Sequence, residues 1–378
     1  MRIVVLGAGL VGAPMAMDLA ADGDIDVTVA DISEAALARL SGHARIETVR
    51  ADLSDRAALA KILAPADMVI NAVPGFMGYA TLETIITAKK NVVDIAFFPE
   101  DPFPLDALAR EKGVTAVVDC GVAPGMSNML VGHCHRLLDY TSSALIYVGG
   151  LPEIRQWPYE YKAVFSPVDV IEEYVRPAVY VENGVIVKRP ALSDPEYLDF
   201  PGLGTLEAFN TDGVRSLYKT LAIPNMKEKT LRYPGHIEKI RVLRESGFFS
   251  TDAVEINGVN VRPLDMTARL LFPMWQLKPG EVDITVMKII VEGEKAGEPT
   301  RFVWDLCDRY DAATGVHSMA RVTGYTATVT ARFIAAGGFA RKGIIAPERI
   351  GSEADAMDFI LKGLAARGVD YRETVERL

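Results

Sequence analysis

Three glycines near the N-terminus are the residues whose spacing points most directly to chemistry. Gly7, Gly9 and Gly12 follow an apolar strand-like run and precede an apolar helical pattern. In that context a G-x-G-x-x-G loop is typical of a dinucleotide site, where the glycines permit a tight turn, a close pyrophosphate and close helix–strand packing. Leu10 and Val11 belong to the same loop, so their backbone is expected to contact the dinucleotide as well. The N-terminus of the following helix is expected to face the phosphates. The alternative is a Gly-rich turn in another α/β domain.

An acidic residue at the end of the next strand-like run, residues 27–30, indicates which dinucleotide binds. Asp31 lies 24 positions after Gly7. A carboxylate there accepts two hydrogen bonds from a ribose diol and repels a 2′-phosphate. The sequence therefore predicts NAD rather than NADP.

Further polar residues stand at the ends of the later strand-like runs. Ligands of an open α/β sheet lie beyond the carboxyl ends of its strands. Asp52 is placed to meet the adenine, although it could equally cap the next helix. Asn71, Val73 and Pro74 are expected beside the nicotinamide ribose, unless they form a plain strand-to-loop exit.

The carboxylate of Asp94 is the predicted catalytic group. It ends a strand-like run on the nicotinamide half of the sheet. A carboxylate in that position can hold a substrate ammonium or take its proton. A helix cap or an ion pair is the alternative. Tyr79 is expected to line the substrate pocket, or to belong to the core.

A second group of candidates surrounds a Pro-Gly turn in the second half of the chain. Thr230, Arg232 and His236 are delivered there by a strand-like run. Arg232 can hold a carboxylate bidentately, and His236 can relay protons near neutral pH. A surface ion pair and a solvated histidine are the alternative. Arg176 and Arg215 are weaker carboxylate candidates.

No metal site is predicted. His133 and His135 are two positions apart on a predicted helix, so they point in different directions, and no carboxylate cluster is nearby. Cys120 is interpreted as a packing thiol rather than a nucleophile. The turn over residues 121–128 either brings backbone amides to the nicotinamide or serves as a domain crossover.

The protein has 378 residues, which is long enough for two domains. Alternating strand and helix patterns predict a Rossmann-type doubly wound parallel sheet over residues 1–128. Longer β-like runs predict an inserted α+β domain with a mainly antiparallel sheet over 129–315, including a hairpin turn at Asn183-Gly184. Residues 316–378 are expected to form helices that return to the first domain. Ser33 and Asp55 are predicted helix N-caps.

Composition excludes several other classes of protein. A net charge of −10 and the lack of a Lys/Arg-rich block argue against nucleic-acid binding. No uncharged apolar run approaches about 18 residues, so no membrane span is expected. Three scattered cysteines suit a reducing compartment. Because the N-terminus is interpreted as strand, loop and helix rather than a targeting segment, we expect a cytoplasmic protein.

Several segments together resemble the saccharopine dehydrogenase superfamily, and within it the L-lysine 6-dehydrogenases. The resemblance extends over almost the whole sequence. One departure is Asn210, where this group often has Tyr, a position that bears on the exact substrate. The matching segments are residues 7–12, 93–97, 119–128, 172–178, 206–213, 230–236 and 319–325.

The resemblance implies NAD-dependent oxidation of a side-chain amine. Lysine would lose hydride from its ε-carbon, release ammonia and leave allysine, which cyclises to piperideine-6-carboxylate. It also implies a homodimer formed through the sheet of the inserted domain. Two alternatives stay open: a saccharopine-type enzyme that forms or cleaves a secondary amine, and a non-catalytic NAD-binding scaffold.

Overall fold

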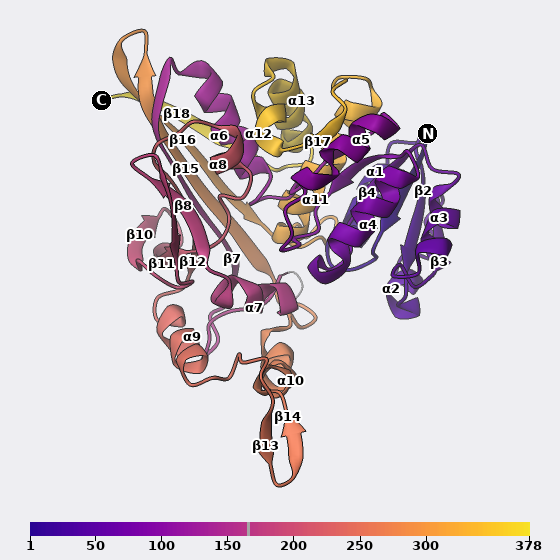
Figure 1. Ribbon diagram of the computed structural model, residues 1–378, viewed down its shortest axis with the longest axis horizontal. Coiled ribbons are helices and arrows are strands. Elements are labelled where there is room, and N and C mark those ends of the chain that lie inside the picture. Colours follow the sequence, from indigo (N-terminus) through magenta and orange to yellow (C-terminus); the bar gives the residue numbers. More distant parts are fainter. Residues whose placement is uncertain (165–166) are drawn as a thin grey trace. The chain divides into compact units, whose positions relative to one another are not determined.

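The computed structural model describes residues 1–164 and 167–378, which divide into two compact units (Figure 1). Unit 1 comprises Met1–Leu137 and Met319–Tyr371. Unit 2 comprises Leu138–Ser318 and Arg372–Leu378. Each unit has its own sheet, and each is described separately below.

Unit 1 is built on a seven-stranded parallel sheet in the order β17-β6-β5-β4-β1-β2-β3. The change of direction beside β1 is the point at which doubly wound sheets bind ligands. The predicted Rossmann-type doubly wound parallel sheet is thereby confirmed. Its strands are β1 Arg2–Leu6, β2 Asp26–Asp31, β3 Ile46–Arg50, β4 Met68–Asn71, β5 Asn91–Asp94, β6 Thr115–Val117 and β17 Gly343–Ile345.

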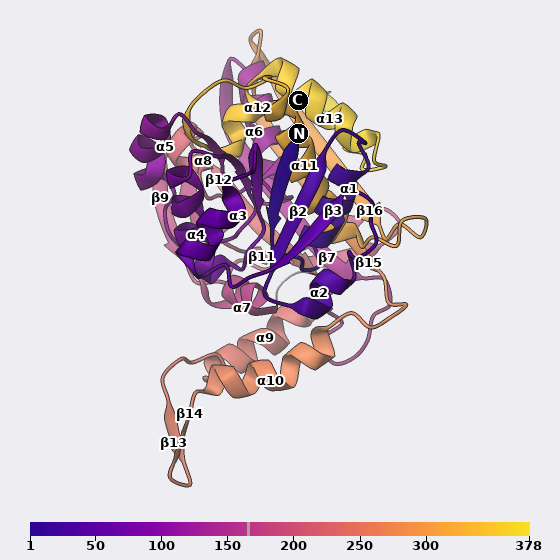
Figure 2. The same ribbon diagram turned by 90° about the vertical axis from the view of Figure 1, so that its right-hand side faces the viewer.

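Helices cover this sheet on both faces (Figure 2). The central strands are apolar and almost wholly buried, as expected for parallel strands covered on both sides. The helices are α1 Gly12–Ala20, α2 Glu34–Ala38, α3 Arg56–Leu63, α4 Gly75–Thr87, the 3-10 turn η1 Phe103–Leu105, α5 Asp106–Lys112, α6 Met126–Leu137, α11 Ser318–Ala335, α12 Pro347–Gly351 and α13 Ala354–Ala365.

Local sequence signals fix several of these helices. Ser33 caps α2 by accepting a hydrogen bond from the amide of Ala36. Asp55 caps α3 by accepting from the amides of Ala57 and Ala58. Side chains that accept hydrogen bonds from first-turn amides are the ordinary way to start a helix. Both predicted N-caps are therefore confirmed.

The C-terminal helices of unit 1 are tied to α1 by a compact charge network. Asp18 on α1 accepts from Arg332 at 2.7 Å, from Arg367 at 2.6 Å and from the hydroxyl of Thr328 at 2.6 Å. Asp22 accepts from Arg332 as well. The network joins residues more than 300 positions apart, so the chain returns to the dinucleotide-type sheet after unit 2.

Unit 2 is built on a mainly antiparallel nine-stranded sheet. Its path is β10-β11-β12-β7-β15-β16-β18, with β8 paired to β12 and β9 paired to β8. Among the strands that the structure describes in this sheet, β7 and β12 form the one parallel pair. The strands are β7 Tyr140–Pro152, β8 Ala178–Glu182, β9 Val185–Arg189, β10 Glu196–Phe200, β11 Gly204–Asn210, β12 Met226–Arg232, β15 Asp283–Lys295, β16 Glu298–Arg309 and β18 Arg372–Arg377.

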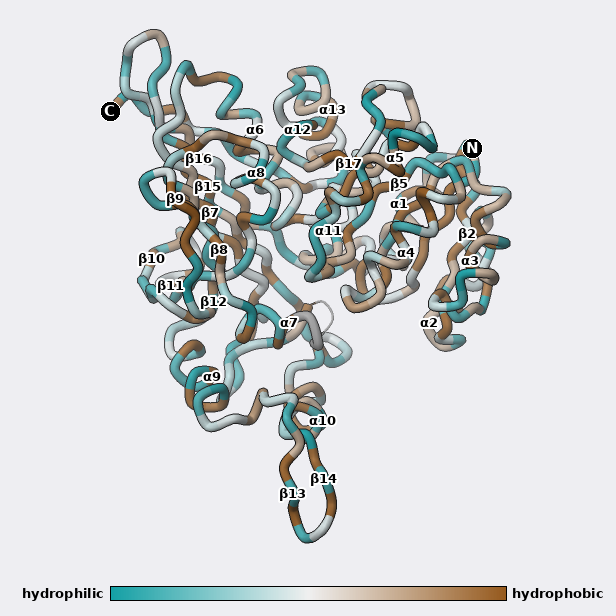
Figure 3. Tube along the Cα trace, in the orientation of Figure 1, coloured by the Kyte–Doolittle hydropathy of each residue, from teal (hydrophilic) through white to brown (hydrophobic). Residues whose placement is uncertain are grey.

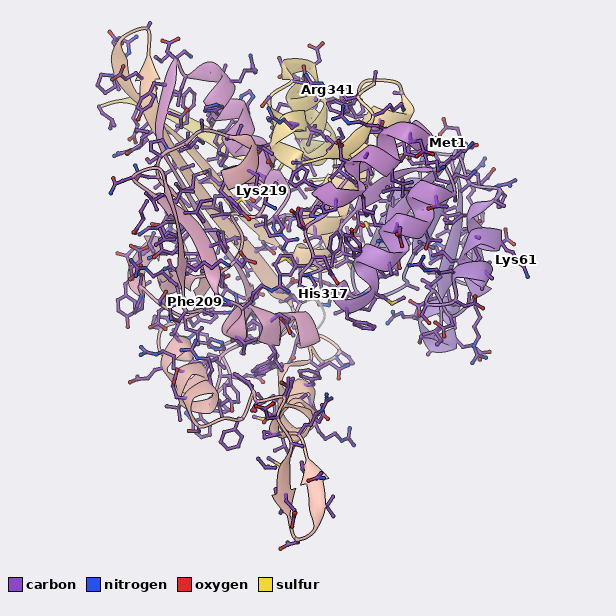
Figure 4. The ribbon with its side chains drawn as sticks, viewed as in Figure 1. Met1, Lys61, Phe209, Lys219, His317 and Arg341 are labelled. Atoms are coloured by element: carbon purple, nitrogen blue, oxygen red, sulfur yellow. The ribbon has the colours of Figure 1, made fainter. Side chains whose placement is uncertain are left out.

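Short helices and one separate hairpin complete unit 2. Asn183 and Gly184 both have positive φ, and they join β8 to β9 as predicted. Phe209 on β11, labelled in Figure 4, is fully buried in the core beneath α7, α9 and α10. These elements are α7 Pro167–Val175, α8 Leu217–Thr220, α9 His236–Glu245, the hairpin of β13 Val254–Ile256 and β14 Val259–Val261, and α10 Pro263–Trp275.

The tail differs from the expected run of helices. Residues 343–345 add the strand β17 to the first sheet, and residues 372–377 pair with β16 in unit 2. The three-residue β17 is too short to show a strand period, and its pairing with β6 decides its conformation. β18 is an exposed edge strand without an apolar face, so the amphipathic pattern that signals a strand is missing.

The Asp18 network predicts a large effect on stability. We expect Asp18→Ala to lower the free energy of unfolding by about 3 kcal/mol, because Arg332 and Arg367 lose a partly buried partner. Chemical denaturation followed by circular dichroism measures this change. Asp26→Ala is the matched control, because its partner Arg45 is exposed and such pairs contribute about 0–1 kcal/mol. Equal losses in both variants would contradict a special role for the network.

Candidate active site

The glycine loop of unit 1 is shaped by close backbone approaches. A Cβ on Gly12 would lie 2.1 Å from the carbonyl oxygen of Gly7, and a Cβ on Gly7 would lie 2.6 Å from that of Ala72. Gly7 also has φ of 106°, a conformation that favours glycine. A Cβ on Gly9 would meet nothing within 4 Å, so this glycine leaves open space above the loop.

This loop fits the pyrophosphate of a dinucleotide. The helix α1 begins directly after it, and Val11 at the N-cap supplies no side-chain cap to the first-turn amides. Uncapped amides and the positive end of a helix dipole attract phosphate. Leu10 is half exposed on the loop. A bound dinucleotide would be held by the backbone of residues 7–12.

Asp31 lies at the end of β2, directly beside the loop. Its carboxylate accepts one hydrogen bond from the amide of Ala8 and one from the amide of Ser33, both at 2.7 Å. Arg39 donates to the carbonyl oxygen of Ala8 at 3.0 Å. Asp31 thus fixes the loop, and a carboxylate has further lone pairs for a ribose diol. The same corner also holds a guanidinium that the sequence analysis did not single out.

The predicted adenine contact, Asp52, lies in an exposed turn after β3. Its carboxylate accepts from both the amide and the hydroxyl of Ser54, which lowers its pKa. Asp55, not Asp52, caps α3. The helix-cap alternative for Asp52 is therefore wrong, whereas its contact with adenine stays a prediction.

Asn71 and Asp94 meet at the carboxyl ends of the neighbouring strands β4 and β5. Both are fully buried, and the Asn71 amide nitrogen donates to Asp94 Oδ2 at 2.9 Å. The amide of Ala96 donates to Asp94 Oδ1 at 2.7 Å. Burial nevertheless raises the pKa of Asp94 to about 8, with Asp119 adding a like charge from the end of β6. Asp94 is therefore a carboxyl group that exchanges its proton near neutral pH.

The Asn71 side chain is suited to either protonation state of Asp94. Its Oδ1 has no hydrogen-bond partner among the residues that the structure describes. Rotating the amide by 180° presents this oxygen to a protonated Asp94, while the orientation shown presents the NH2 group to the carboxylate. The pair can therefore hold a proton or release it without losing its hydrogen bond.

The remaining predicted residues of unit 1 differ in burial, and the contacts of Val73 and Pro74 with a cofactor stay predictions. Val73 is buried, Pro74 precedes α4, and Tyr79 packs edge-on against Phe98 with ring centroids 6.0 Å apart. Tyr79 thereby joins the core beneath α4. Cys120 is fully buried, and burial raises the pKa of its thiol to about 12. Its thiol therefore stays protonated at neutral pH.

In unit 2, Arg232 is almost fully buried at the end of β12. It donates to Glu173 at 2.7 Å, and its guanidinium stacks on Tyr161 at 4.5 Å from the ring centroid. The Nε of Arg232 and the indole nitrogen of Trp275 have no hydrogen-bond partners within the described parts of the protein. Both are buried donors near Tyr161, whose ring centroid lies 5.5 Å from that of Trp275. A buried group that only accepts hydrogen bonds, such as a carboxylate, fits these donors.

Both ring nitrogens of His236 are already hydrogen-bonded. Nδ1 lies 2.9 Å from the carbonyl oxygen of Tyr159, which only accepts, so Nδ1 carries the proton and Nε2 accepts from the Tyr174 hydroxyl at 2.9 Å. Burial and the charge of Arg232 lower the pKa of His236 to about 3. The ring is therefore neutral at physiological pH and holds Tyr174 in place.

A polar stripe along β12 includes a residue that the sequence analysis missed. Glu228, Thr230 and Arg232 alternate along the strand and so share one face. The Thr230 and Thr211 hydroxyls lie 2.8 Å apart, and Thr211 donates to buried Glu228 at 2.5 Å. Burial raises the pKa of Glu228 to about 8. The period-2 spacing in the sequence was the signal that could have found it.

Two further predictions concern a weaker arginine and a metal. The guanidinium of Arg176 lies 3.6 Å from the carboxylate of Glu172 and 3.9 Å from that of Asp212, so two acidic residues flank it. Among residues 1–164 and 167–378, no group of three His, Cys, Asp or Glu side chains is arranged to hold a metal ion. The helices described there include none with the length and apolar character needed to cross a bilayer.

Comparison with known proteins identifies the family. Residues 121–369 match the saccharopine dehydrogenase C-terminal domain, and residues 3–117 match the saccharopine dehydrogenase NADP binding domain. The protein therefore belongs to the saccharopine dehydrogenase family, which confirms the superfamily that the sequence resembled.

Two curated relatives illustrate the range of similarity. Saccharopine dehydrogenase [NADP(+), L-glutamate-forming] of Saccharomyces cerevisiae is 30% identical over 271 residues, which cover 68% of this chain and 60% of that protein. The mitochondrial alpha-aminoadipic semialdehyde synthase of Bos taurus is 26% identical over 280 residues, covering 70% of this chain and 30% of that protein. The sequence thus aligns with only part of each relative.

A solved structure shows the same fold. The apo histidine-tagged saccharopine dehydrogenase (L-Glu forming) from Saccharomyces cerevisiae superposes with a TM-score of 0.81 at 23% identity, covering 99% of each chain. This similarity extends through both units and supports the fold.

Asp94 predicts an unusual dependence of stability on pH. The pKa of Asp94 is about 8 in the folded protein, against an ordinary value of 3.8. Between these pH values the folded protein binds a proton at Asp94 that the unfolded protein does not bind, so the free energy of unfolding falls as pH rises. Asp94→Asn removes this loss. The stability gain of the variant over wild type should therefore grow from pH 5 to pH 8, by up to about 1.4 kcal/mol per pH unit.

Denaturant titrations of both proteins across this pH range measure the difference. Asp24→Asn is the control, because Asp24 is an exposed carboxyl of the same unit. A gain that does not change with pH would show that Asp94 is ionised in the folded protein.

Proposed function

We propose that this protein is a nicotinamide-dinucleotide-dependent oxidoreductase that acts on a C–N bond in the side chain of a basic amino acid. The first candidate reaction is oxidative deamination of L-lysine to allysine, with release of ammonia and cyclisation to piperideine-6-carboxylate. The observation that carries this proposal is buried Asp94, a proton-exchanging carboxyl on β5, two strands from the glycine loop of β1.

The proposed role of Asp94 follows from the chemistry of an amine. A nicotinamide dinucleotide, when bound, supplies the hydride acceptor. An ammonium nitrogen has no lone pair with which to form a C=N bond, so it must first lose a proton. Asp94 Oδ2 takes that proton, and Asn71 rotates its amide to hold the protonated acid. Water then adds to the imine carbon and ammonia leaves.

Arg232 is proposed to hold the substrate carboxylate. Its unpartnered Nε and the nearby Trp275 donor support this role, as does Thr230 on the same face of β12. Glu173, whose carboxylate pairs with Arg232 at 2.7 Å, is proposed to attract the substrate's α-ammonium as well. We assign His236 a positioning role through Tyr174 rather than proton relay, because both of its nitrogens are bonded.

NAD is the proposed cofactor, on the evidence of Asp31. Its carboxylate ends β2 and is hydrogen-bonded to the glycine loop, which supports a contact with a ribose diol, and its charge disfavours a 2′-phosphate. NADP is the alternative, supported by Arg39 in the same corner and by the cofactor in the name of the yeast relative.

A saccharopine-type reaction is the second candidate function. The activities in the names of the relatives favour it. A substrate with an additional carboxylate would be held by a second arginine. Arg176 offers a second guanidinium in unit 2. A non-catalytic scaffold would have no use for a buried carboxyl of raised pKa beside the strand ends. We further propose that the protein is a homodimer and that it is cytoplasmic. The three free cysteines support the second of these proposals, because free thiols suit a reducing compartment.

Cofactor choice tests the role of Asp31. We expect at least about tenfold higher kcat/KM with NAD than with NADP, equivalent to about 1.4 kcal/mol. Asp31→Ser should narrow this ratio by removing the charge, and Arg39→Ala should widen it. Initial rates with both cofactors provide the measurement, and equal turnover by the wild type would reject the ribose-diol role.

A substrate screen tests the proposed reaction. NADH and NADPH formation is followed with lysine, ornithine, diamines and saccharopine, and lysine is expected to give the highest kcat/KM. The rate should rise with pH towards about 8, as Asp94 loses its proton. Asp94→Asn should lower kcat/KM by about 10²–10⁴ and abolish this rise, whereas Asp24→Asn should change neither.

The possible results separate the candidates. Turnover of saccharopine but not of lysine would replace the first reaction with the second. No turnover of any amine, with dinucleotide binding intact, would favour the scaffold. Near-native turnover by Asp94→Asn would move the base to another residue.

A further inference from the structure

The hairpin of β13 and β14 extends from unit 2 beyond α9 and α10 (Figures 1 and 2). Asn257 and Gly258 form its two-residue turn, with φ of 52° and 81°. The two strands pair only with each other and form a separate two-stranded sheet. We call residues 254–261 the arm.

The arm has one apolar face and one polar face. Val254 pairs with Val261 and Ile256 pairs with Val259, so these four side chains share a face. Glu255 and Asn260 pair on the opposite face. Figure 3 shows the hydrophobic stretches of both strands. We call the four apolar residues the arm face.

The arm face is exposed to solvent. Val254, Ile256 and Val259 are 46%, 48% and 61% exposed. An isolated two-stranded hairpin is marginally stable in water, and an exposed apolar patch indicates an interaction site. The structure thus shows a ribbon whose apolar face is unused in the isolated protein.

Helix α10 carries a second exposed apolar stripe next to the arm in sequence. Met266, Leu270 and Met274 recur every four residues, so they lie on one side of the helix. The buried residues Leu271 and Trp275 face the core of unit 2 instead. The helix therefore exposes three apolar side chains to solvent, alongside the exposed charged residues Asp265 and Arg269.

Charge indicates which partner fits. The region from α9 to the loop after α10, residues 236–280, contains six Lys or Arg and five Asp or Glu residues, a net of +1. The whole protein carries −10, so the remainder carries −11. Two copies of an acidic protein repel each other least through this near-neutral region. A strongly basic or acidic partner would find no complementary charge on the uncharged arm face.

We propose that the arm face is an interface with a second copy of this protein. A two-fold axis packs the two identical arm faces together, because an uncharged β-branched surface is complementary to itself. This interface is separate from the sheet that the family resemblance implies for dimerisation.

A pair of single substitutions tests the interface. Ile256→Asp places a charge on the arm face, and Asn260→Asp places the same charge on the opposite face of the same hairpin. In sedimentation equilibrium of the full-length protein, Ile256→Asp should raise the dissociation constant of the assembly at least about tenfold. Asn260→Asp should leave it within about twofold of wild type.

Hydrogen exchange gives a readout that needs no variant. The amides of residues 254–261 should exchange more slowly at high protein concentration than at low concentration. Three results would each overturn the proposal. The first is an equal effect of Ile256→Asp and Asn260→Asp on the assembly, and the second is an amide exchange rate that does not depend on protein concentration. The third is a wild type that stays monomeric up to about 100 µM, a concentration far above typical dissociation constants of stable complexes.

Discussion

The hydrogen bond between Asn71 and Asp94 is the interaction on which the proposed chemistry depends. Parallel strands bring these two residues to the same edge of the sheet, where the apolar core ends. Burial there makes the charged form of Asp94 costly, while Asn71 and the Ala96 amide reduce that cost. The balance keeps the carboxyl near the protonation equilibrium that the proposed amine oxidation needs. A solvent-exposed acid at the same strand end would be ionised throughout the neutral range.

Unit 2 also contains buried ionisable side chains, but their charges are compensated in a different way. Arg232 is buried as deeply as Asp94, yet Glu173 provides a counter-charge and the Tyr161 ring a stacking surface. His236 is hydrogen-bonded between Tyr159 and Tyr174 and stays neutral, because burial and the charge of Arg232 lower its pKa. Burial therefore produces an ion pair in one case and a neutral, positioned ring in the other. Which outcome occurs depends on the partners within hydrogen-bonding distance.

The core elements of each unit are held by packing and charge networks, whereas the arm exposes three of its four apolar residues to solvent. Asp18 joins helices from both ends of the sequence into unit 1, and the nine-stranded sheet organises unit 2. The arm of residues 254–261 makes only its own strand pairing. An exposed apolar face gains stability from association. The proposed contact with a second copy and the proposed catalytic residues therefore belong to different parts of the fold.

The sequence alone determined the features that local spacing encodes. The glycine loop, Asp31 at the end of its strand, the caps at Ser33 and Asp55 and the family were all accessible from it, because a turn, a cap or a strand end involves few neighbouring residues. Only the tertiary structure decided the protonation of Asp94 and the pairing of Arg232 with Glu173, because burial and long-range contacts set both. It also decided that His236 is bonded at both nitrogens and that the final residues form β18, since neither leaves a periodic signal in the sequence.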